Sequence, residues 1–201
     1  MLSKFKIELC FLVLLTDTDQ QVILETIKTM GDIPLMPGSH FKVIDNFLNK
    51  KDFKKIQERL LAKDFPWYYT PNITFVDESK TDKYYFTHLF YYHDRPLSPS
   101  IDILQPLFKK MDITSLYRVK GNFYPNIGKQ SYNKPHKDFS FKHKSAIFYI
   151  NNNDGYTILN NGKTKIESIA NRILFFDSTK NHSSTHCTND HARVNININY
   201  F

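Results

Sequence analysis

The sequence predicts a mainly β protein of the α+β class, with a β-sandwich or jelly-roll (double-stranded β-helix) core and helices packed on one face. Two helical patterns come first, and six closely spaced strand patterns follow from residue 116 onward. Aromatic residues make up 15% of the 201 residues, with 17 Phe and 12 Tyr, which is typical of strands that pack face to face. A chain of this length can bury a full core.

The helical patterns lie between strand-like stretches in the first half of the chain. Residues 41–47 read as a strand, and Asn49 is placed to cap a helix that runs to about Ala62, because apolar residues recur on one face. Residues 83–92 are strand-like and aromatic. Ser98-Pro99 then opens a second amphipathic helix, since proline is tolerated at the first helical position. We therefore expect both helices on the same side of the sheets.

The second half alternates strand patterns with turn signals. Asn153-Asp154-Gly155 and Asn160-Asn161-Gly162 are predicted hairpin turns. The candidate strands are residues 116–124, 145–151, 156–159, 163–169, 172–176 and 193–201.

The last of these strands has one apolar and one polar face, because successive side chains of a strand point in opposite directions. The apolar members are Val194, Ile196, Ile198 and Tyr200, and the polar members are Arg193, Asn195, Asn197 and Asn199. Two interpretations are open: an edge that faces solvent, or a barrel interior that holds a polar ligand, in which case Arg193 points inward.

A Pro/Gly cluster at residues 31–39 indicates a linker, so we expect an N-terminal extension over residues 1–40 and the main domain over residues 41–201. The apolar run at residues 9–15 is too short to span a bilayer and makes a poor signal peptide, because Glu8 interrupts it. Two cysteines, Cys10 and Cys187, cannot build a disulfide framework. These features favour a cytoplasmic location, in the host cytoplasm if the protein is viral, and no membrane partner.

The net charge of +7 allows a nucleic-acid partner. The lysines are spread along the chain with no run of five like charges, so a solvated basic surface is the preferred interpretation.

A candidate metal site begins at His136-Lys137-Asp138. Residues two apart on extended backbone project to the same side, so the imidazole and the carboxylate can converge on one ion. A third, neutral imidazole would complete the facial ligand set of non-haem iron(II) oxygenases. With 8 His and 20 acidic residues in 201, roughly one His-x-Asp or His-x-Glu pair is expected by chance. The pair alone is therefore weak evidence for a metal site, and the assignment depends on the residues around it.

Downstream of this pair, His182 follows a hydrophobic strand, and Arg193 opens the last strand. A dicarboxylate cosubstrate needs a cation deep in the barrel, and arginine suits that role because it binds a carboxylate bidentately and stays charged when buried.

The ordered set His136-x-Asp138, His182 and Arg193 resembles the 2-oxoglutarate/Fe(II)-dependent dioxygenase superfamily, in its prolyl-hydroxylase-like branch. The resemblance covers residues 116–201, is weaker over residues 41–111 and is absent before them. The tail is also similar to small bacteriophage oxygenases. The motifs that carry this likeness are Phe176-Asp177-Ser178, His182, Cys187-Thr188-Asn189-Asp190, Arg193 and Asn195-Ile196-Asn197-Ile198-Asn199-Tyr200-Phe201.

The resemblance implies iron ligands at His136, Asp138 and His182. It implies that Arg193, with Tyr149 and Tyr124, binds 2-oxoglutarate. Halogenating relatives replace the ligating carboxylate with a small residue, so Asp138 indicates oxygen insertion. Ascorbate is expected to support turnover.

Several alternatives stay open. His186 is a rival of His182 as the distal ligand, with His182 preferred because it follows the Phe-Phe-Asp-Ser strand end directly. His143 is expected to be a solvated or substrate-facing loop residue, and Cys187 a small packed residue. Trp67, Tyr68 and Tyr69 are expected in the core.

The expected activity is hydroxylation of a peptidyl side chain, with proline as the first choice. An oxygenase that acts on a nucleobase is the second choice. A catalytically inactive, cupin-like binding module is the third.

Overall fold

The computed structural model describes residues 41–71 and 84–201. The predicted extension over residues 1–40 lies outside the described residues, so its boundary with the main domain stays a prediction. No helix in the described ranges is long and apolar enough to cross a membrane.

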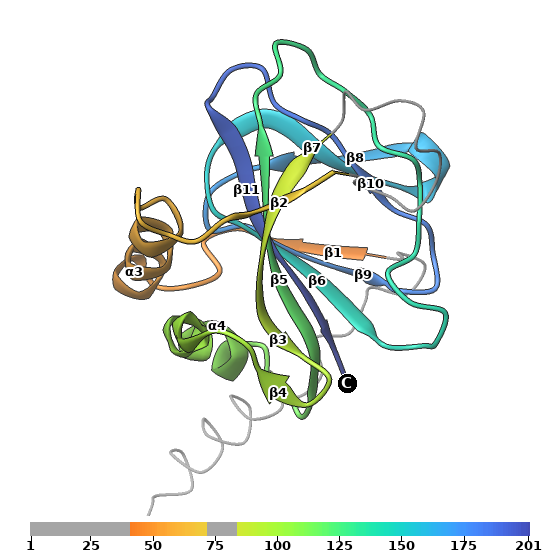
Figure 1. The fold of residues 1–201 in the computed structure, drawn as a ribbon. Helices are drawn as coiled ribbons and strands as arrows, with labels where there is room; N and C mark the ends of the chain where they lie inside the picture. Colours follow the sequence, from red (N-terminus) through yellow and green to blue (C-terminus); the bar gives the residue numbers. More distant parts are fainter. Residues whose placement is uncertain (1–40, 72–83) are drawn as a thin grey trace, which may run out of the picture. The chain divides into compact units, whose positions relative to one another are not determined.

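Two antiparallel sheets form the core of the protein (Figure 1). The larger sheet has the strand order β1-β9-β6-β11-β5-β3-β2, with β4 paired to β3, and the smaller sheet has the order β10-β7-β8. This arrangement confirms the predicted mainly β, jelly-roll architecture. The strands of the larger sheet are β1 (Phe41–Ile44), β2 (Tyr68–Thr70), β3 (Tyr85–Tyr92), β4 (Arg95–Pro96), β5 (Leu116–Pro125), β6 (Lys144–Tyr149), β9 (Ile173–Asp177) and β11 (Ala192–Tyr200), and those of the smaller sheet are β7 (Asn153–Leu159), β8 (Thr164–Ser168) and β10 (Ser183–Ser184).

The helices pack on the face of the larger sheet that points away from the smaller one (Figure 1). Helix α3 (Lys50–Leu60) begins as predicted at Asn49, whose Oδ1 accepts a hydrogen bond from the Asp52 N–H at 2.9 Å. The second helical segment is a 3₁₀ turn, η1 (Pro99–Leu104), that continues into α4 (Gln105–Lys110). Apolar side chains of both segments share one buried cluster with the larger sheet, which confirms the predicted placement.

Alternation along β6 and β11 divides the interior into two layers. Phe148 of β6 and Ile196 of β11 belong to the cluster under the helices. Ile147 and Tyr149 of β6 instead pack with residues of β8 and β9 in a second cluster. On β11, Arg193 and Asn195 face this second side, where they line a pocket. The polar face of β11 is therefore an interior surface.

The alternative interpretation of β11 as a solvent-facing edge is wrong. β11 pairs with β5 on one side and with β6 on the other, and all nine of its residues are buried. A central strand cannot present its backbone edge to water.

Two other expectations are also wrong. Asn153-Asp154-Gly155 lies inside β7 at a register irregularity, whereas Asn160–Gly162 does form the predicted connection, as a 3₁₀ turn between β7 and β8. An added Cβ on Gly155 would lie 2.6 Å from Cδ of Arg193, so close packing accounts for the glycine there. Tyr68 and Tyr69 are each 62% exposed, since β2 is the terminal strand of the larger sheet.

Candidate metal centre

His136, Asp138 and His182 meet at one point of the interior. Their candidate ligand atoms all lie within 4.8 Å of one another. The backbones of His136 and His182 form an isolated antiparallel bridge with both N–H···O distances at 2.9 Å, and their rings lie 4.6 Å apart. Asp138 follows two residues after His136, and the two side chains point to the same side, as predicted from this spacing. The bridge therefore brings the downstream histidine to the upstream pair.

The protonation states of these three side chains suit metal binding. Burial lowers the pKa of His136, and it lowers the pKa of His182 to about 4, against the attraction of Asp138. Burial alone would raise the pKa of Asp138, but Arg118, His182 and Lys120 hold it well below its usual value. Near neutral pH the site therefore has two neutral imidazoles and one carboxylate, which are the forms that bind a cation.

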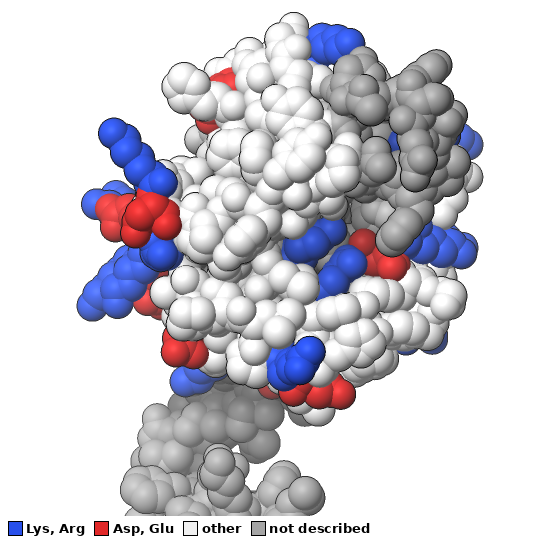
Figure 2. Space-filling model, viewed as in Figure 1, with Lys and Arg blue, Asp and Glu red and all other residues white. Residues whose placement is uncertain are grey.

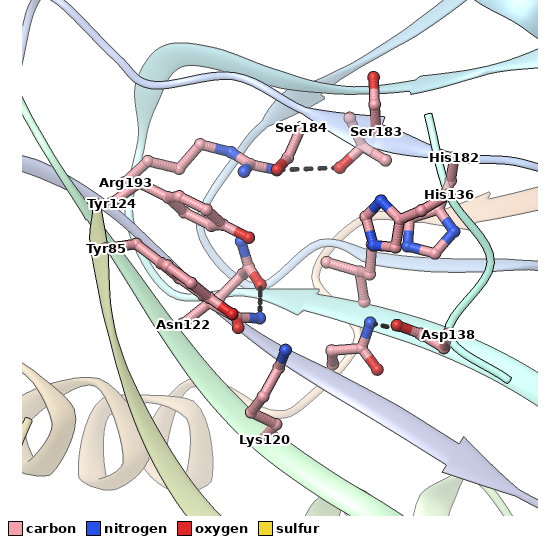
Figure 3. Close-up of a pocket in the computed structure, with 14 residues that line it drawn as sticks. Tyr85, Lys120, Asn122, Tyr124, His136, Asp138, His182, Ser183, Ser184 and Arg193 are labelled. Atoms are coloured by element: carbon pink, nitrogen blue, oxygen red, sulfur yellow. Dashed lines mark hydrogen bonds between the residues drawn. The ribbon is translucent and has the colours of Figure 1, made fainter. Parts of the chain in front are cut away.

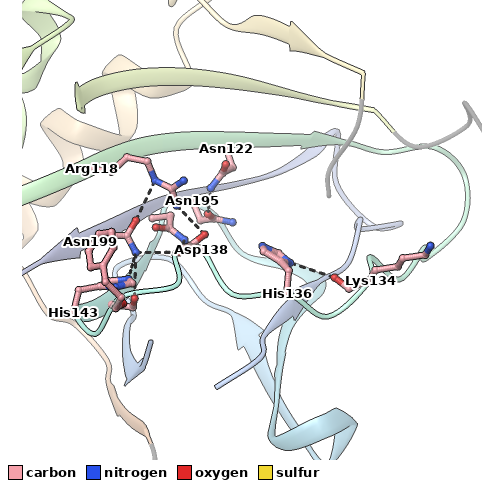
Figure 4. Close-up of polar contacts among 11 residues, drawn as sticks. Arg118, Asn122, Lys134, His136, Asp138, His143, Asn195 and Asn199 are labelled. Atoms are coloured by element: carbon pink, nitrogen blue, oxygen red, sulfur yellow. Dashed lines mark hydrogen bonds and ion pairs between the residues drawn. The ribbon is translucent and has the colours of Figure 1, made fainter. Parts of the chain in front are cut away.

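Both carboxylate oxygens of Asp138 are held by neighbouring side chains (Figure 4). Nη2 of Arg118 forms an ion pair with Oδ1 at 2.7 Å. Asn197 and Asn199, both on β11, donate their Nδ2 hydrogens to Oδ2 at 3.0 Å. Asn199 also accepts a 3.0 Å hydrogen bond from Nε of Arg118. These contacts fix the orientation of the carboxylate, as partners around a ligand commonly do.

The three side chains border a pocket between the two sheets (Figure 3). The pocket is polar on most sides. It is lined from β3, β5, β6, β7, β10 and β11 and from the segments that carry His136, Asp138 and His182. Its lining residues are Tyr85, Lys120, Asn122, Tyr124, His136, Asp138, Ile147, Thr157, His182, Ser183, Ser184, Arg193, Asn195 and Asn197.

Arg193 lies across the pocket from the histidines (Figure 3) and is fully buried. Its Nη2 donates to Oγ1 of Thr157 at 2.9 Å and its Nη1 to the carbonyl of Thr185 at 3.5 Å, while Nε has no hydrogen-bond partner. Within residues 41–71 and 84–201, no carboxylate forms an ion pair with it. A buried, uncompensated guanidinium is a strong reason to expect an anionic ligand.

The two predicted tyrosines both lie beside Arg193 but differ in access. The Arg193 Cζ is 5.4 Å from the ring centroid of Tyr124 and 5.7 Å from that of Tyr149. Tyr124 lines the pocket. Tyr149 is fully buried outside the lining, and its hydroxyl donates to Oγ1 of Thr157 at 2.8 Å. Thr157 thus accepts from both Tyr149 and Arg193, which places Tyr149 behind the arginine.

The other residues considered from the sequence lie outside the three-residue cluster. His186 is fully buried beside Tyr124, with ring centroids 5.8 Å apart, and is not part of the three-residue cluster. His143 is buried, and its Nε2 lies 3.1 Å from Nδ2 of Asn199, so the expectation of a solvated or substrate-facing loop residue is wrong. Cys187 is buried, as expected.

Sequence reasoning missed several residues of this site. Arg118 and Lys120 lie in β5, and no sequence motif there indicates that they belong to a site. Nothing in the sequence around Thr157 of β7 indicates a role for it either. The Asn195-x-Asn197-x-Asn199 alternation was the one available indication that β11 contributes polar groups to the interior.

Neither a protein-family model nor a curated protein matches the sequence. A prolyl hydroxylase from Trichoplax adhaerens, in complex with a hypoxia inducible factor oxygen degradation domain peptide fragment, is 17% identical, with a TM-score of 0.62 over 92% of this chain and 93% of that chain. The chain therefore has the fold of this prolyl hydroxylase.

Two further solved structures show how far this oxygenase fold extends. The viral collagen prolyl hydroxylase of Paramecium Bursaria Chlorella virus-1 is 13% identical, with a TM-score of 0.53 over 83% of this chain and 97% of that chain. The non-heme alpha ketoglutarate dependent epimerase SnoN from nogalamycin biosynthesis is 11% identical, with a TM-score of 0.59 over 90% and 84%. The oxygenase fold therefore serves more than one reaction.

Proposed function

We propose that the protein is an iron(II)- and 2-oxoglutarate-dependent oxygenase. The observation that carries this proposal is one pocket with two complementary ends. At one end, neutral His136 and His182 lie beside ionised Asp138. At the other end is buried Arg193, which has no acidic partner among the described residues and an unpaired Nε. Two histidines and one carboxylate with an open side are the donor set of non-haem iron(II) sites.

The residues present fit both groups. His136, Asp138 and His182 would hold the metal, and Arg193 would bind the distal carboxylate of 2-oxoglutarate, supported by Tyr124 and Thr157. Bound iron(II) supplies the activation of dioxygen, with 2-oxoglutarate as the source of the remaining electrons. Arg118 and the two asparagines hold the carboxylate of Asp138 ionised and oriented. The two sheets limit the access of water to the reacting groups.

The proposed reaction is hydroxylation of a peptidyl side chain, with proline as the first choice. Two of the solved structures that share the fold are prolyl hydroxylases, and one of them holds a peptide. Oxygen insertion is favoured because Asp138 supplies a carboxylate where halogenating relatives have a small residue. We expect ascorbate to support turnover.

An oxygenase acting on nucleic acid is the second candidate, based on the net charge of +7. In Figure 2, however, basic side chains are dispersed, and over α3 they are mixed with acidic ones. On the face shown, this distribution is unlike the continuous basic surface typical of nucleic-acid binding.

The decisive experiment measures the conversion of 2-oxoglutarate to succinate by purified protein with iron(II) and ascorbate. Wild type and the His191→Ala control, which changes an exposed histidine, should form succinate at the same rate, while His136→Ala should form none. Equal succinate formation by His136→Ala and wild type would refute the metal assignment. An inactive binding module would show no iron-dependent turnover in any variant.

The substrate is then sought by mass spectrometry of proteins and nucleic acids incubated with active protein and with His136→Ala. Proteins that gain one oxygen atom only with the active protein support the peptidyl assignment. Oxygen gained only in nucleic acid would replace it with the second candidate.

A further inference from the structure

Lys120 is a basic residue of the pocket that the proposed function does not use. It lies on β5, opposite Asn197 of β11, and its side chain points into the pocket (Figure 3). Its Nζ is 5.6 Å from the ring centroid of Tyr85. Among the described residues, no carboxylate pairs with this ammonium group and no hydrogen bond from it is formed.

A pair of stacked tyrosines separates Lys120 from Arg193. The rings of Tyr85 and Tyr124 are nearly parallel, with centroids 5.3 Å apart and an interplanar angle of 12°. The Arg193 Cζ lies 5.4 Å from the Tyr124 centroid, and Lys120 approaches Tyr85 (Figure 3). The two cations therefore lie at opposite ends of the tyrosine pair, and a carboxylate bound by Arg193 leaves Lys120 without an anion.

The charges of the loaded site do not balance. Asp138 compensates Arg118, with which it forms an ion pair. The charges of a bound iron(II) and a bound 2-oxoglutarate dianion cancel each other. The loaded site therefore keeps an excess of positive charge. Because Arg193 pairs with the distal carboxylate of 2-oxoglutarate, Lys120 is the cation that lacks an ion-pair partner. Burial, and to a lesser extent Arg118, lowers the pKa of Lys120 to about 8 against the attraction of Asp138, so the amine is still mostly protonated near pH 7.

We propose that Lys120 forms a second anion subsite, which binds a carboxylate of the primary substrate. The substrate class would be an acidic peptide segment, in which an Asp or Glu side chain is or adjoins the residue that is oxidised. This inference rests on the proposed function and names its substrate class.

A peptide carboxylate fits this subsite better than a nucleic-acid phosphate. A phosphate group commonly recruits several donors at once, such as an arginine fork or successive backbone N–H groups. Lys120 offers one ammonium group, and Arg118 next to it on the same strand face is already paired with Asp138.

The test compares two probes that differ only in charge, the α-amides of N-acetylglutamate and of N-acetylglutamine. Their binding is measured by calorimetry to protein loaded with manganese(II) and 2-oxoglutarate, which undergoes no turnover. Wild type should prefer the acid by about tenfold or more, as expected for one charge-assisted hydrogen bond. Lys120→Met should lose the preference, and Lys120→Arg should keep it. No preference in wild type, or an undiminished one in Lys120→Met, would overturn the inference.

Two controls separate this inference from the proposed function. The binding of 2-oxoglutarate is measured in the same samples. If Lys120→Met weakens 2-oxoglutarate binding but keeps the preference for the acid, Lys120 belongs to the cosubstrate site and the inference is wrong, while the proposed function stands. If wild type binds no 2-oxoglutarate, the proposed function fails, and the same comparison of probes on unloaded protein still decides the role of Lys120.

Stability provides a readout that is independent of activity. Without any probe, Lys120→Met should unfold at the same temperature as wild type or higher, because the variant no longer desolvates an unpaired ammonium group. The acidic probe should then raise the unfolding temperature of wild type and leave that of Lys120→Met unchanged. An oligothymidylate that binds wild type more tightly than the acidic probe, and that loses this advantage in Lys120→Met, would overturn the assignment to a peptide.

Discussion

Nη2 of Arg118 and Oδ1 of Asp138 lie 2.7 Å apart, and the two side chains are only 14% and 6% exposed. The arginine therefore neutralises the carboxylate proposed as a metal ligand. Removing one partner of a buried ion pair leaves the other charge desolvated and uncompensated. This pair should have a large effect on stability.

We predict that Arg118→Met lowers the free energy of unfolding of the metal-free protein by about 3 kcal/mol. Urea unfolding in the presence of a chelator measures this change. The matched control is Lys54→Met, which breaks the exposed Lys54–Glu58 pair on α3 and should change stability by about 0.5 kcal/mol or less. Equal effects of the two substitutions would show that the buried pair has no special role.

Metal-induced stabilisation should distinguish the two rival histidines. Because His182 and not His186 lies beside Asp138, manganese(II) at about 100 times its Kd should stabilise both wild type and His186→Ala by about 2.7 kcal/mol. His182→Ala should gain nothing. His186 is fully buried, so its removal lowers stability in itself, and the measured quantity is the difference with and without metal. If metal stabilised His182→Ala but not His186→Ala, His186 and not His182 would be the distal ligand.

Substitutions at Arg193 should act on the cosubstrate. Loss of its charge-assisted hydrogen bonds in Arg193→Met should raise the apparent KM for 2-oxoglutarate by about tenfold to a hundredfold, and Arg193→Lys should raise it less. The apparent KM of each variant is measured from the rate of succinate formation at varied 2-oxoglutarate concentration. An unchanged KM in Arg193→Met would place the cosubstrate elsewhere.

Gly155→Ala should affect the cosubstrate without changing any charged group. The new Cβ would lie 2.6 Å from Cδ of Arg193, so the buried arginine must shift. We predict an increase of about tenfold in the apparent KM for 2-oxoglutarate, since misplacement of a bidentate cation weakens its hydrogen bonds. A KM equal to that of wild type, in a variant with unchanged stability, would contradict the packing argument.

The pH dependence of stability should include a contribution from His88, far from the proposed metal ligands. Burial lowers its pKa below the usual value, and Arg59 adds to this effect, while the 2.8 Å contact between Nδ1 and the Pro66 carbonyl opposes it. A histidine with a depressed pKa in the folded state contributes stability that is fully present above its unfolded pKa of about 6.5, and that stability is lost as the pH falls from this value through the lower folded-state pKa.

The test compares wild type with His88→Gln in urea between about pH 7.5 and about pH 5.5. Wild type should lose more unfolding free energy over this interval than the variant does, because the variant no longer takes up this proton on unfolding. The contributions of the other histidines cancel in the difference. Parallel curves would show that His88 titrates alike in the folded and unfolded states.

Local features of the sequence were sufficient for part of this structure. The cap at Asn49, the Pro99 helix start and the alternation along β11 all depend on neighbouring residues, so periodicity and side-chain chemistry predict them. The convergence of His136 and Asp138 depends on a two-residue spacing and was predicted for the same reason.

Tertiary structure decided the rest, because strand register depends on residues far apart in the chain. Pairing of β11 with both β5 and β6 made its polar face an interior surface, which the alternation left open. The bridge to His136 brought His182, and not His186, beside the His136–Asp138 pair. Register also placed Lys120 in the pocket opposite Asn197, and close packing against Arg193 explains Gly155, where local turn propensity predicted a hairpin. A single-residue shift of any of these strands would turn the same side chains to the opposite face.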